Sequence, residues 1–82
     1  MTLELDVHGY SVEQAIYAIQ RTIVANPKCN CLEIIHGYNN GRKLKEALMN
    51  KINIHNKRVL KTCPVPFNNG RTFVFLDVSL RN

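Results

Sequence analysis

The chain has 82 residues, 45% of them hydrophobic, which is enough for one modest core and unlike the composition of disordered proteins. No apolar run approaches the roughly 18 residues of a membrane span, and the acidic start MTLELDV does not resemble a secretory signal. We therefore expect one domain over residues 1–82, in the cytoplasm and without membrane contact.

The three cysteines are Cys29, Cys31 and Cys63. An odd number in a chain without a signal peptide argues against a disulfide framework, so reduced thiols are expected. Structural zinc sites pair their ligands at C-x2-C or wider spacing, and this chain has only C-N-C and no second Cys/His pair. Buried cysteines are the preferred interpretation, with no metal and no cofactor.

The net charge of +5 is concentrated in the second half of the chain. Residues 42–82 carry nine Lys and Arg side chains against two acidic ones, whereas residues 1–41 carry two against four. This asymmetry favours a polyanionic partner, nucleic acid first, although a solvated basic surface would have the same composition.

The first two elements expected are a strand and a helix. Residues 3–8, LELDVH, alternate apolar and polar side chains, as a half-buried strand does. Ser11 and Gln14 form a capping box that begins a helix, and the Asn-Pro pair at 26–27 closes it. The buried face of this helix is predicted at Val12, Ala15, Ile16, Ile19 and Ile23.

Residues 31–36, CLEIIH, form a short apolar run rich in β-branched side chains, which predicts a strand buried on both faces. A turn over residues 37–41 follows. Leu44, Leu48 and Ile52 then predict an amphipathic helix that ends at about residue 55.

The last two strands are expected at KRVLKTC, residues 57–63, and TFVFLDV, residues 72–78. Between them, PVPFNNGR at 64–71 contains two prolines and a glycine and is interpreted as a loop. The element order is therefore βαβαββ. It predicts an α/β fold, a two-layer sandwich with both helices on one face of a mixed four-stranded sheet.

The tripeptide His-Gly-Tyr occurs twice, at 8–10 and at 36–38, each time after a predicted strand. A strand, helix, strand unit of this length implies a right-handed crossover and parallel pairing, so both strands end at the same edge of the sheet. Ligands of open α/β sheets bind at that edge. We expect His8 and His36 to face one cleft there.

Asp6 and His8 lie on one face of the first strand, about 7 Å apart between Cα atoms, where a carboxylate can orient an imidazole. Cleavage of RNA needs a base for the 2′-hydroxyl and an acid for the leaving oxygen, and histidines perform both near neutral pH. Asp6, His8 and His36 are the candidate catalytic residues. The alternative is that the two histidines only cap strand ends.

The candidate nucleic-acid contacts surround the two turns. Glycines allow the backbone to approach a ligand, tyrosines can stack on unpaired bases, and basic side chains bind phosphate. The tyrosines are equally compatible with packing under the loops, and Lys51, Lys57 and Lys61 are interpreted as solvated surface. The candidates are Gly9, Tyr10, Gly37, Tyr38, Gly41, Arg42, Lys43, Lys45 and Arg71.

The motifs resemble those of the Smr (small MutS-related) domain. The family's LDLHG, HGxGxG and late G-x-T-x-V elements are similar to LDVHG at 5–9, HGYNNG at 36–41 and GRTFV at 70–74. The resemblance covers nearly the whole chain and implies a two-layer α/β domain that binds nucleic acid, in many members an endonuclease that cleaves RNA or nicks DNA. It assigns cleavage to Asp6 and His8.

The resemblance also assigns substrate contact to His36, Gly37 and Gly41. The chain departs from the family pattern at Asn39, at FNNG over 67–70 and by one residue before Leu44. Two functions follow: an endonuclease that prefers RNA to DNA and needs no metal, or a non-catalytic module that binds RNA or the ribosome.

Overall fold

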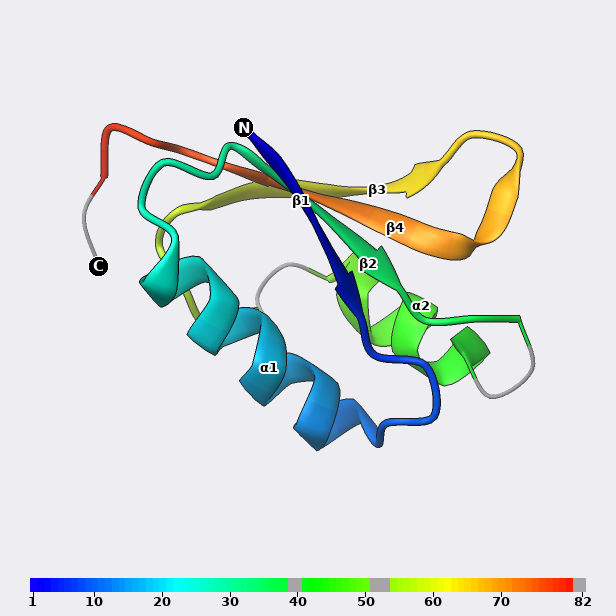
Figure 1. Cartoon of the computed structure of the whole chain (residues 1–82). Coiled ribbons are helices and arrows are strands. Elements are labelled where there is room, and N and C mark those ends of the chain that lie inside the picture. Colours follow the sequence, from blue (N-terminus) through cyan, green and yellow to red (C-terminus); the bar gives the residue numbers. More distant parts are fainter. Residues whose placement is uncertain (39–40, 51–53, 81–82) are drawn as a thin grey trace.

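A computed structural model of the chain describes residues 1–38, 41–50 and 54–80. Its elements follow the order βαβαββ, as predicted. They are β1 (Thr2–Asp6), α1 (Val12–Ala25), β2 (Cys31–Ile35), α2 (Gly41–Met49), β3 (Val59–Val65) and β4 (Asn68–Leu76) (Figure 1). No helix of the described part is long and apolar enough to cross a membrane.

The four strands form one mixed sheet in the order β1-β2-β4-β3. β1 and β2 pair in parallel, with Leu5 opposite Ile34 and Asp6 opposite Ile35. β4 is antiparallel to both of its neighbours. The carboxyl ends of β1 and β2 therefore meet the beginning of β4 at one edge, which confirms the shared edge predicted for the two His-Gly-Tyr turns.

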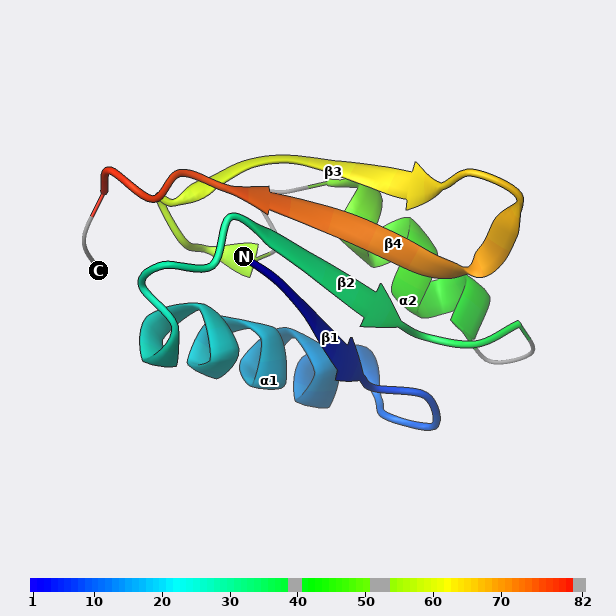
Figure 2. The ribbon, with the colours of Figure 1, turned by 45° about the horizontal axis from the view of Figure 1, so that its top comes forward.

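Both helices cover the same face of the sheet and leave the other face open (Figure 2). The core lies between these two layers. Alternate strand residues and one stripe of each helix fill it, because strand side chains alternate between faces and helix side chains recur every three or four residues. The core residues include Val7, Ala15, Ile19, Ile23, Leu32, Ile34, Leu44, Leu48, Ile54, Val74 and Leu76.

The local signals in the first half of the chain are confirmed. The Ser11 hydroxyl accepts a hydrogen bond from the Gln14 backbone N–H, and the Gln14 side chain accepts one from the Ser11 backbone N–H. Asn26 caps the carboxyl end of α1, one residue before the proline. Ser11, Gln14 and Pro27 thus define the helix through interactions within one turn of its ends.

The prediction that residues 31–36 are buried on both faces is wrong. Leu32 and Ile34 are fully buried against the helices, whereas Glu33 and Ile35 face the open side of the sheet and are half-buried. Glu33 and Ile35 are partly covered by neighbouring side chains of the same sheet face, because neither α1 nor α2 packs on that face. Phe73 of β4 is the register partner of Glu33.

Two boundaries in the second half also differ from the prediction. α2 ends at Met49 instead of about residue 55, and Ile52 lies outside the described residues. The expected loop at 64–71 is mostly strand, because only Pro66 and Phe67 form the turn between β3 and β4. Pro64 is accommodated since β3 is an edge strand, where a missing N–H leaves no neighbour unpaired.

Arg58 is a structural residue that the sequence analysis counted only as part of the basic half. Its side chain is completely buried, and its guanidinium donates five hydrogen bonds to backbone carbonyls. The acceptors belong to the end of α1, to the connection that follows and to the end of β4. They are Ile23, Asn26, Pro27, Cys29 and Asp77.

Candidate functional site

Asp6 and His8 form a hydrogen-bonded pair at the end of β1. The Asp6 Oδ1 atom lies 2.5 Å from His8 Nδ1 and also accepts the His8 backbone N–H at 3.0 Å. This backbone bond is an Asx turn, which curls the chain after the strand and brings the imidazole back over the carboxylate. Both side chains remain largely exposed, 52% for Asp6 and 72% for His8.

The pair has a defined proton arrangement. An ionised carboxylate only accepts hydrogen bonds, so His8 Nδ1 is the donor to Asp6 and Nε2 is the ring nitrogen outside this bond. The hydrogen bond from the His8 side chain, then that from its backbone, lowers the pKa of Asp6, and the charge of Arg71 adds to this effect. Asp6 is therefore ionised at neutral pH and holds the His8 ring through Nδ1.

His36 is buried and does not lie on the exposed side with His8. The expectation that the two histidines face one cleft is therefore wrong. His36 ends the neighbouring parallel strand, but its side chain is 1% exposed and lies on the face covered by the helices. Its Nε2 is 2.9 Å from the Thr72 hydroxyl and its Nδ1 is 3.1 Å from the Gly37 carbonyl. Since the register pairs Asp6 with Ile35, His8 lies opposite Gly37 rather than His36.

Gly37 forms the turn that follows the buried His36 and lies beside the exposed His8. Its φ of +83° favours glycine, and a Cβ there would lie 3.6 Å from the Cβ of His8. The backbone N–H groups of His36 and Gly37 both donate to the Gly70 carbonyl at the start of β4. The turn is therefore held directly beside the exposed imidazole.

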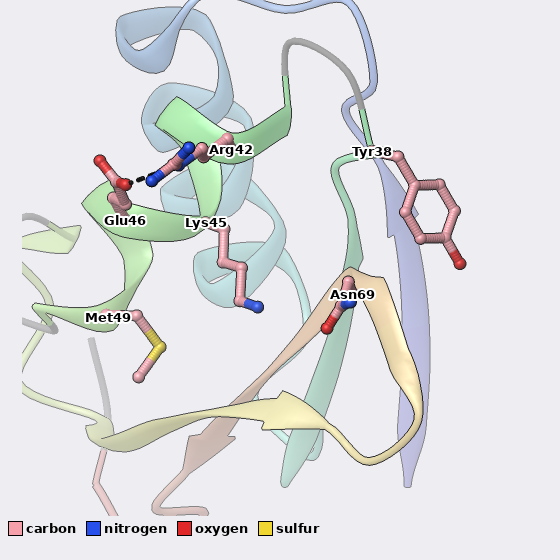
Figure 3. Close-up of a pocket in the computed structure, with 6 residues that line it drawn as sticks. All are labelled: Tyr38, Arg42, Lys45, Glu46, Met49 and Asn69. Atoms are coloured by element: carbon pink, nitrogen blue, oxygen red, sulfur yellow. Dashed lines mark hydrogen bonds and ion pairs between the residues drawn. The ribbon is translucent and has the colours of Figure 1, made fainter.

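A cleft of about 420 Å³ lies next to this turn, between α2 and the β3–β4 hairpin. Lys45 extends from α2 toward the hairpin, where Asn69 lies, and Arg42 pairs with Glu46 on the outer side of the helix (Figure 3). The Arg42–Glu46 distance is 3.2 Å, and both side chains are exposed. The lining residues are Tyr38, Arg42, Lys45, Glu46, Met49 and Asn69.

Tyr38 borders the cleft, and the hydroxyl end of its ring is held against the β3–β4 hairpin. Its hydroxyl donates to the Asn68 side chain at 3.1 Å, and its ring edge lies close to Gly70, where a Cβ would come within 3.1 Å. Any larger residue at Gly70 would displace the ring. Tyr38 nevertheless stays 70% exposed, so one face of the ring is available to a ligand.

Known protein families include one that matches this chain. The family model of the Smr domain matches residues 5–77, nearly the whole chain. The chain belongs to the Smr domain family. Smr domains are a family of the nucleic-acid-binding, nuclease type, and the matched range contains both His-Gly-Tyr turns and β4.

The crystal structure of the Smr domain of Thermus thermophilus MutS2 has the same fold. It aligns with a TM-score of 0.76 at 24% sequence identity, over 90% of this chain and 96% of that chain. At this identity the likeness concerns the fold. No curated protein sequence matches the chain closely enough to count as a relative.

The other residues of this Smr domain that were predicted to contact nucleic acid lie outside the cleft or next to its rim. Tyr10 is exposed beside α1, and Lys43 is exposed on the first turn of α2, which begins at Gly41. Asn39, the departure in the second motif, lies outside the described residues. Gly9 has a φ of +80° and opens onto empty space.

Arg71 is on the open sheet face and is already paired. Its guanidinium contacts the carboxylates of Glu33 and Glu4, the latter at 3.7 Å, and Glu33 contributes most to raising the pKa of Arg71. Two acids thus offset the charge that was expected to bind phosphate. Among residues 1–38, 41–50 and 54–80, no three Asp, Glu, His or Cys side chains are grouped as metal ligands.

The sequence analysis missed the hairpin side of the cleft. Asn68 and Asn69 were assigned to a loop that differs from the family pattern. Asn68 fixes Tyr38 and Asn69 lines the cleft. Only their proximity to the second turn reveals these roles, because they are 30 residues beyond it in sequence.

Proposed function

We propose that this Smr domain binds RNA at the sheet edge and cleaves it through Asp6 and His8 without a metal ion. The observation that carries the proposal is the Asp6–His8 hydrogen bond, which leaves Nε2 of an exposed imidazole oriented for proton transfer. The Asp6 carboxylate and the His8 imidazole are exposed and contribute nothing to the core. Proton transfer therefore explains their arrangement better than packing does.

RNA is the preferred substrate because its own 2′-hydroxyl supplies the nucleophile. His8 Nε2 takes the 2′-hydroxyl proton, the 2′-oxygen bonds to phosphorus, and the bond from phosphorus to the 5′-oxygen breaks. The leaving 5′-oxygen takes a proton from water, and the hydroxide so formed takes the proton from the His8 imidazolium, which restores the neutral ring. The products are a 2′,3′-cyclic phosphate and a 5′-hydroxyl, and Asp6 stabilises the imidazolium formed in between.

The proposed binding path joins the cleft to His8 across the Gly37–Tyr38 turn. Lys45 and Arg42 are placed to contact phosphates on the cleft side, and Lys43 extends the basic surface along α2. Tyr38 lies in this turn and Tyr10 follows the first His-Gly pair, and both rings are exposed. Arg71 is assigned to ordering the sheet face beside Asp6, since Glu33 and Glu4 already pair with it.

His36 is assigned a positioning role in place of the second proton transfer. Burial lowers its pKa, so it is neutral at pH 7, and its ring bridges the Gly37 carbonyl and the Thr72 hydroxyl. It therefore holds the turn that lies beside His8. Catalysis in this scheme uses one exposed histidine.

The test is cleavage of labelled single-stranded RNA by the wild type, His8→Ala and Asp6→Asn. Positioned acid-base catalysis is typically worth about 10² to 10⁴ in rate, so His8→Ala should lose that factor while its RNA affinity stays near wild type. Asp6→Asn should lose less, because the imidazole remains but its orientation and charge partner change.

The end groups and the metal requirement complete this test. The wild type should leave 2′,3′-cyclic phosphates, remain active in a chelator and fail on an RNA with 2′-deoxyribose at the cleaved position. His55→Asn, at another exposed histidine, is the matched control and should cleave like the wild type. Equal activity of His8→Ala and the wild type would refute the catalytic assignment.

The second candidate is a non-catalytic module that binds RNA or the ribosome through the same edge. The observation that favours it is that the described structure offers no second exposed acid beside His8, since His36 is buried. Wild-type protein that binds RNA but shows no cleavage above background would select this function.

A further inference from the structure

Phe67 has an unusual backbone conformation at the tip of the β3–β4 hairpin. It is the second residue of the two-residue turn Pro66-Phe67, and its φ is +61°. Proline followed by a positive φ is typical of a type II turn, whose second position favours Gly or Asn. A bulky side chain there is strained by roughly 1 to 3 kcal/mol.

The ring does not compensate for this strain by packing. Its exposure is 109% of the reference value, so it makes no burying contact with the described part of the chain. Neither the turn nor the core therefore explains a phenylalanine at this position. Strained residues that contribute nothing to stability concentrate at sites that bind ligands.

The hairpin places this ring at the proposed binding edge. The pairing of β3 with β4 shifts by three residues between Pro64 opposite Thr72 and Val65 opposite Asn68. This irregularity bends the start of β4. Asn69 then lines the basic cleft, and Asn68 holds the Tyr38 ring. Phe67 thus stands at the tip of the hairpin that forms one wall of the cleft, two residues before Asn69.

We propose that Phe67 is a stacking platform for one unpaired nucleobase of an RNA strand whose phosphates lie along the basic cleft. The inference rests on the proposed function and specifies its substrate: RNA that is single-stranded or looped at this point. In a duplex, both faces of each base are already stacked, so an exposed ring gains nothing there.

The surroundings favour a nucleobase over an apolar protein partner. Lys45 extends across the cleft toward Asn69, and Arg42 lines the α2 side in an exposed pair with Glu46, so the lining carries a net positive charge that suits a phosphate backbone. Tyr38 supplies a second exposed ring at the same edge. Two rings beside basic side chains are the arrangement by which proteins hold single strands.

Phe67→Asn separates the ring from the fold. Asparagine tolerates a positive φ, so the variant should relieve strain and keep or raise the midpoint of thermal unfolding by a few degrees. Phe67→Tyr keeps an aromatic ring and is the matched control. A fall in the unfolding midpoint of Phe67→Asn would show that the ring packs in the native state and would overturn the proposal.

Binding is measured by fluorescence anisotropy with 2′-O-methyl RNA, which lacks the nucleophile and is not cleaved. Phe67→Asn should weaken binding of a single strand about 5- to 150-fold, the loss expected for one stacked base, and leave a duplex of the same length unaffected. Phe67→Tyr should bind both like the wild type. A 2-aminopurine base in the single strand should be quenched by the wild type and much less by Phe67→Asn.

Three binding outcomes also overturn the proposal. Unchanged single-strand binding by Phe67→Asn, while Arg42→Glu/Lys43→Glu loses affinity, rejects the platform and leaves the proposed function standing; a ring reserved for a protein partner would give this result. Equal losses on single strand and duplex reject base stacking. Wild-type protein that binds neither probe rejects the proposed function as well.

Discussion

His8 and His36 end two parallel strands, yet one ring is exposed and the other is buried. The difference arises because the strand residues alternate between the two faces of the sheet, and His36 falls on the helix-covered side while His8 follows Asp6 on the open side. In the proposed function, proton transfer at this edge therefore falls to His8 alone, and His36 supports the turn.

The burial of His36 predicts a pH dependence of stability. Desolvation lowers its pKa below the value of about 6.5 expected in the unfolded chain, and the charge of Lys45 contributes. Below that pH the unfolded chain binds more protons than the folded one. The stability from this residue is thus fully present above about pH 6.5 and is lost as the pH falls toward the lower, folded pKa.

Urea unfolding of the wild type and His36→Gln from about pH 7 to pH 5 measures this loss. One residue contributes a slope of at most about 1.4 kcal/mol per pH unit, which should be absent in His36→Gln and present in His55→Asn. The lowered pKa of Asp6 affects a separate pH range, because the stability that the ionised Asp6 contributes is present above about pH 3.8 and is lost below it. Identical slopes in the three proteins would contradict the burial of a neutral His36.

At the scale of elements, Arg58 joins α1, β2 and β4 at the end of the molecule opposite the candidate site. Its five hydrogen bonds satisfy carbonyls that follow the helix or precede β2, together with the Asp77 carbonyl after β4. The last carbonyls of a helix have no partner within the helix. One buried guanidinium therefore caps α1 and fixes it against the sheet.

Replacement of Arg58 by Met should cost about 3 to 5 kcal/mol in the free energy of unfolding, because buried carbonyls lose their donors. Arg58→Lys should also be strongly destabilised, since three donors on a compact ammonium cannot replace the five bonds. Lys57→Met, at the exposed neighbouring position, is the matched control and should stay within about 0.5 kcal/mol of wild type. A loss below about 1 kcal/mol for Arg58→Met in urea unfolding would mean that other donors reach these carbonyls.

Over the whole molecule, the positive charge of the second half serves two purposes. Arg58 is buried and Arg71 is paired with acids, so neither adds an available cation to the surface. Arg42, Lys43 and Lys45 lie on α2 beside the cleft, at the same edge as His8. The net charge alone therefore overstates the number of cations available to a ligand, and the proposed binding surface lies on the side of α2 that borders the cleft.

Reversal of Arg42 and Lys43 to Glu should weaken RNA binding with little dependence on sequence and reduce the salt dependence. Each lost phosphate contact with a single strand lowers the slope of log affinity against log salt by about 0.7. Lys57→Glu/Lys61→Glu changes the net charge equally at exposed positions away from the cleft and should keep the slope. If both double variants lose affinity and slope equally, binding follows overall charge and the interface is not at α2.

The sequence by itself determined the element order, the capping of α1 and the shared edge of the two turns. These features follow from interactions between residues close in the chain: alternation in LELDVH, the Ser11–Gln14 box and the short crossover that enforces parallel pairing. The closeness of Asp6 and His8 was also accessible, because only Val7 separates them, although β1 ends at Asp6 and an Asx turn rather than a shared strand face brings them together. All of these features depend on residues that are close together in the chain.

The tertiary structure decided which faces are covered and which distant groups meet. CLEIIH is apolar on both sides, so its sequence could not show that His36 turns toward the helices, and two prolines concealed an edge strand. Arg58 looked like surface charge because its acceptors come from segments 19 to 35 residues away. Contacts across such separations depend on how the layers pack, and no local pattern encodes them.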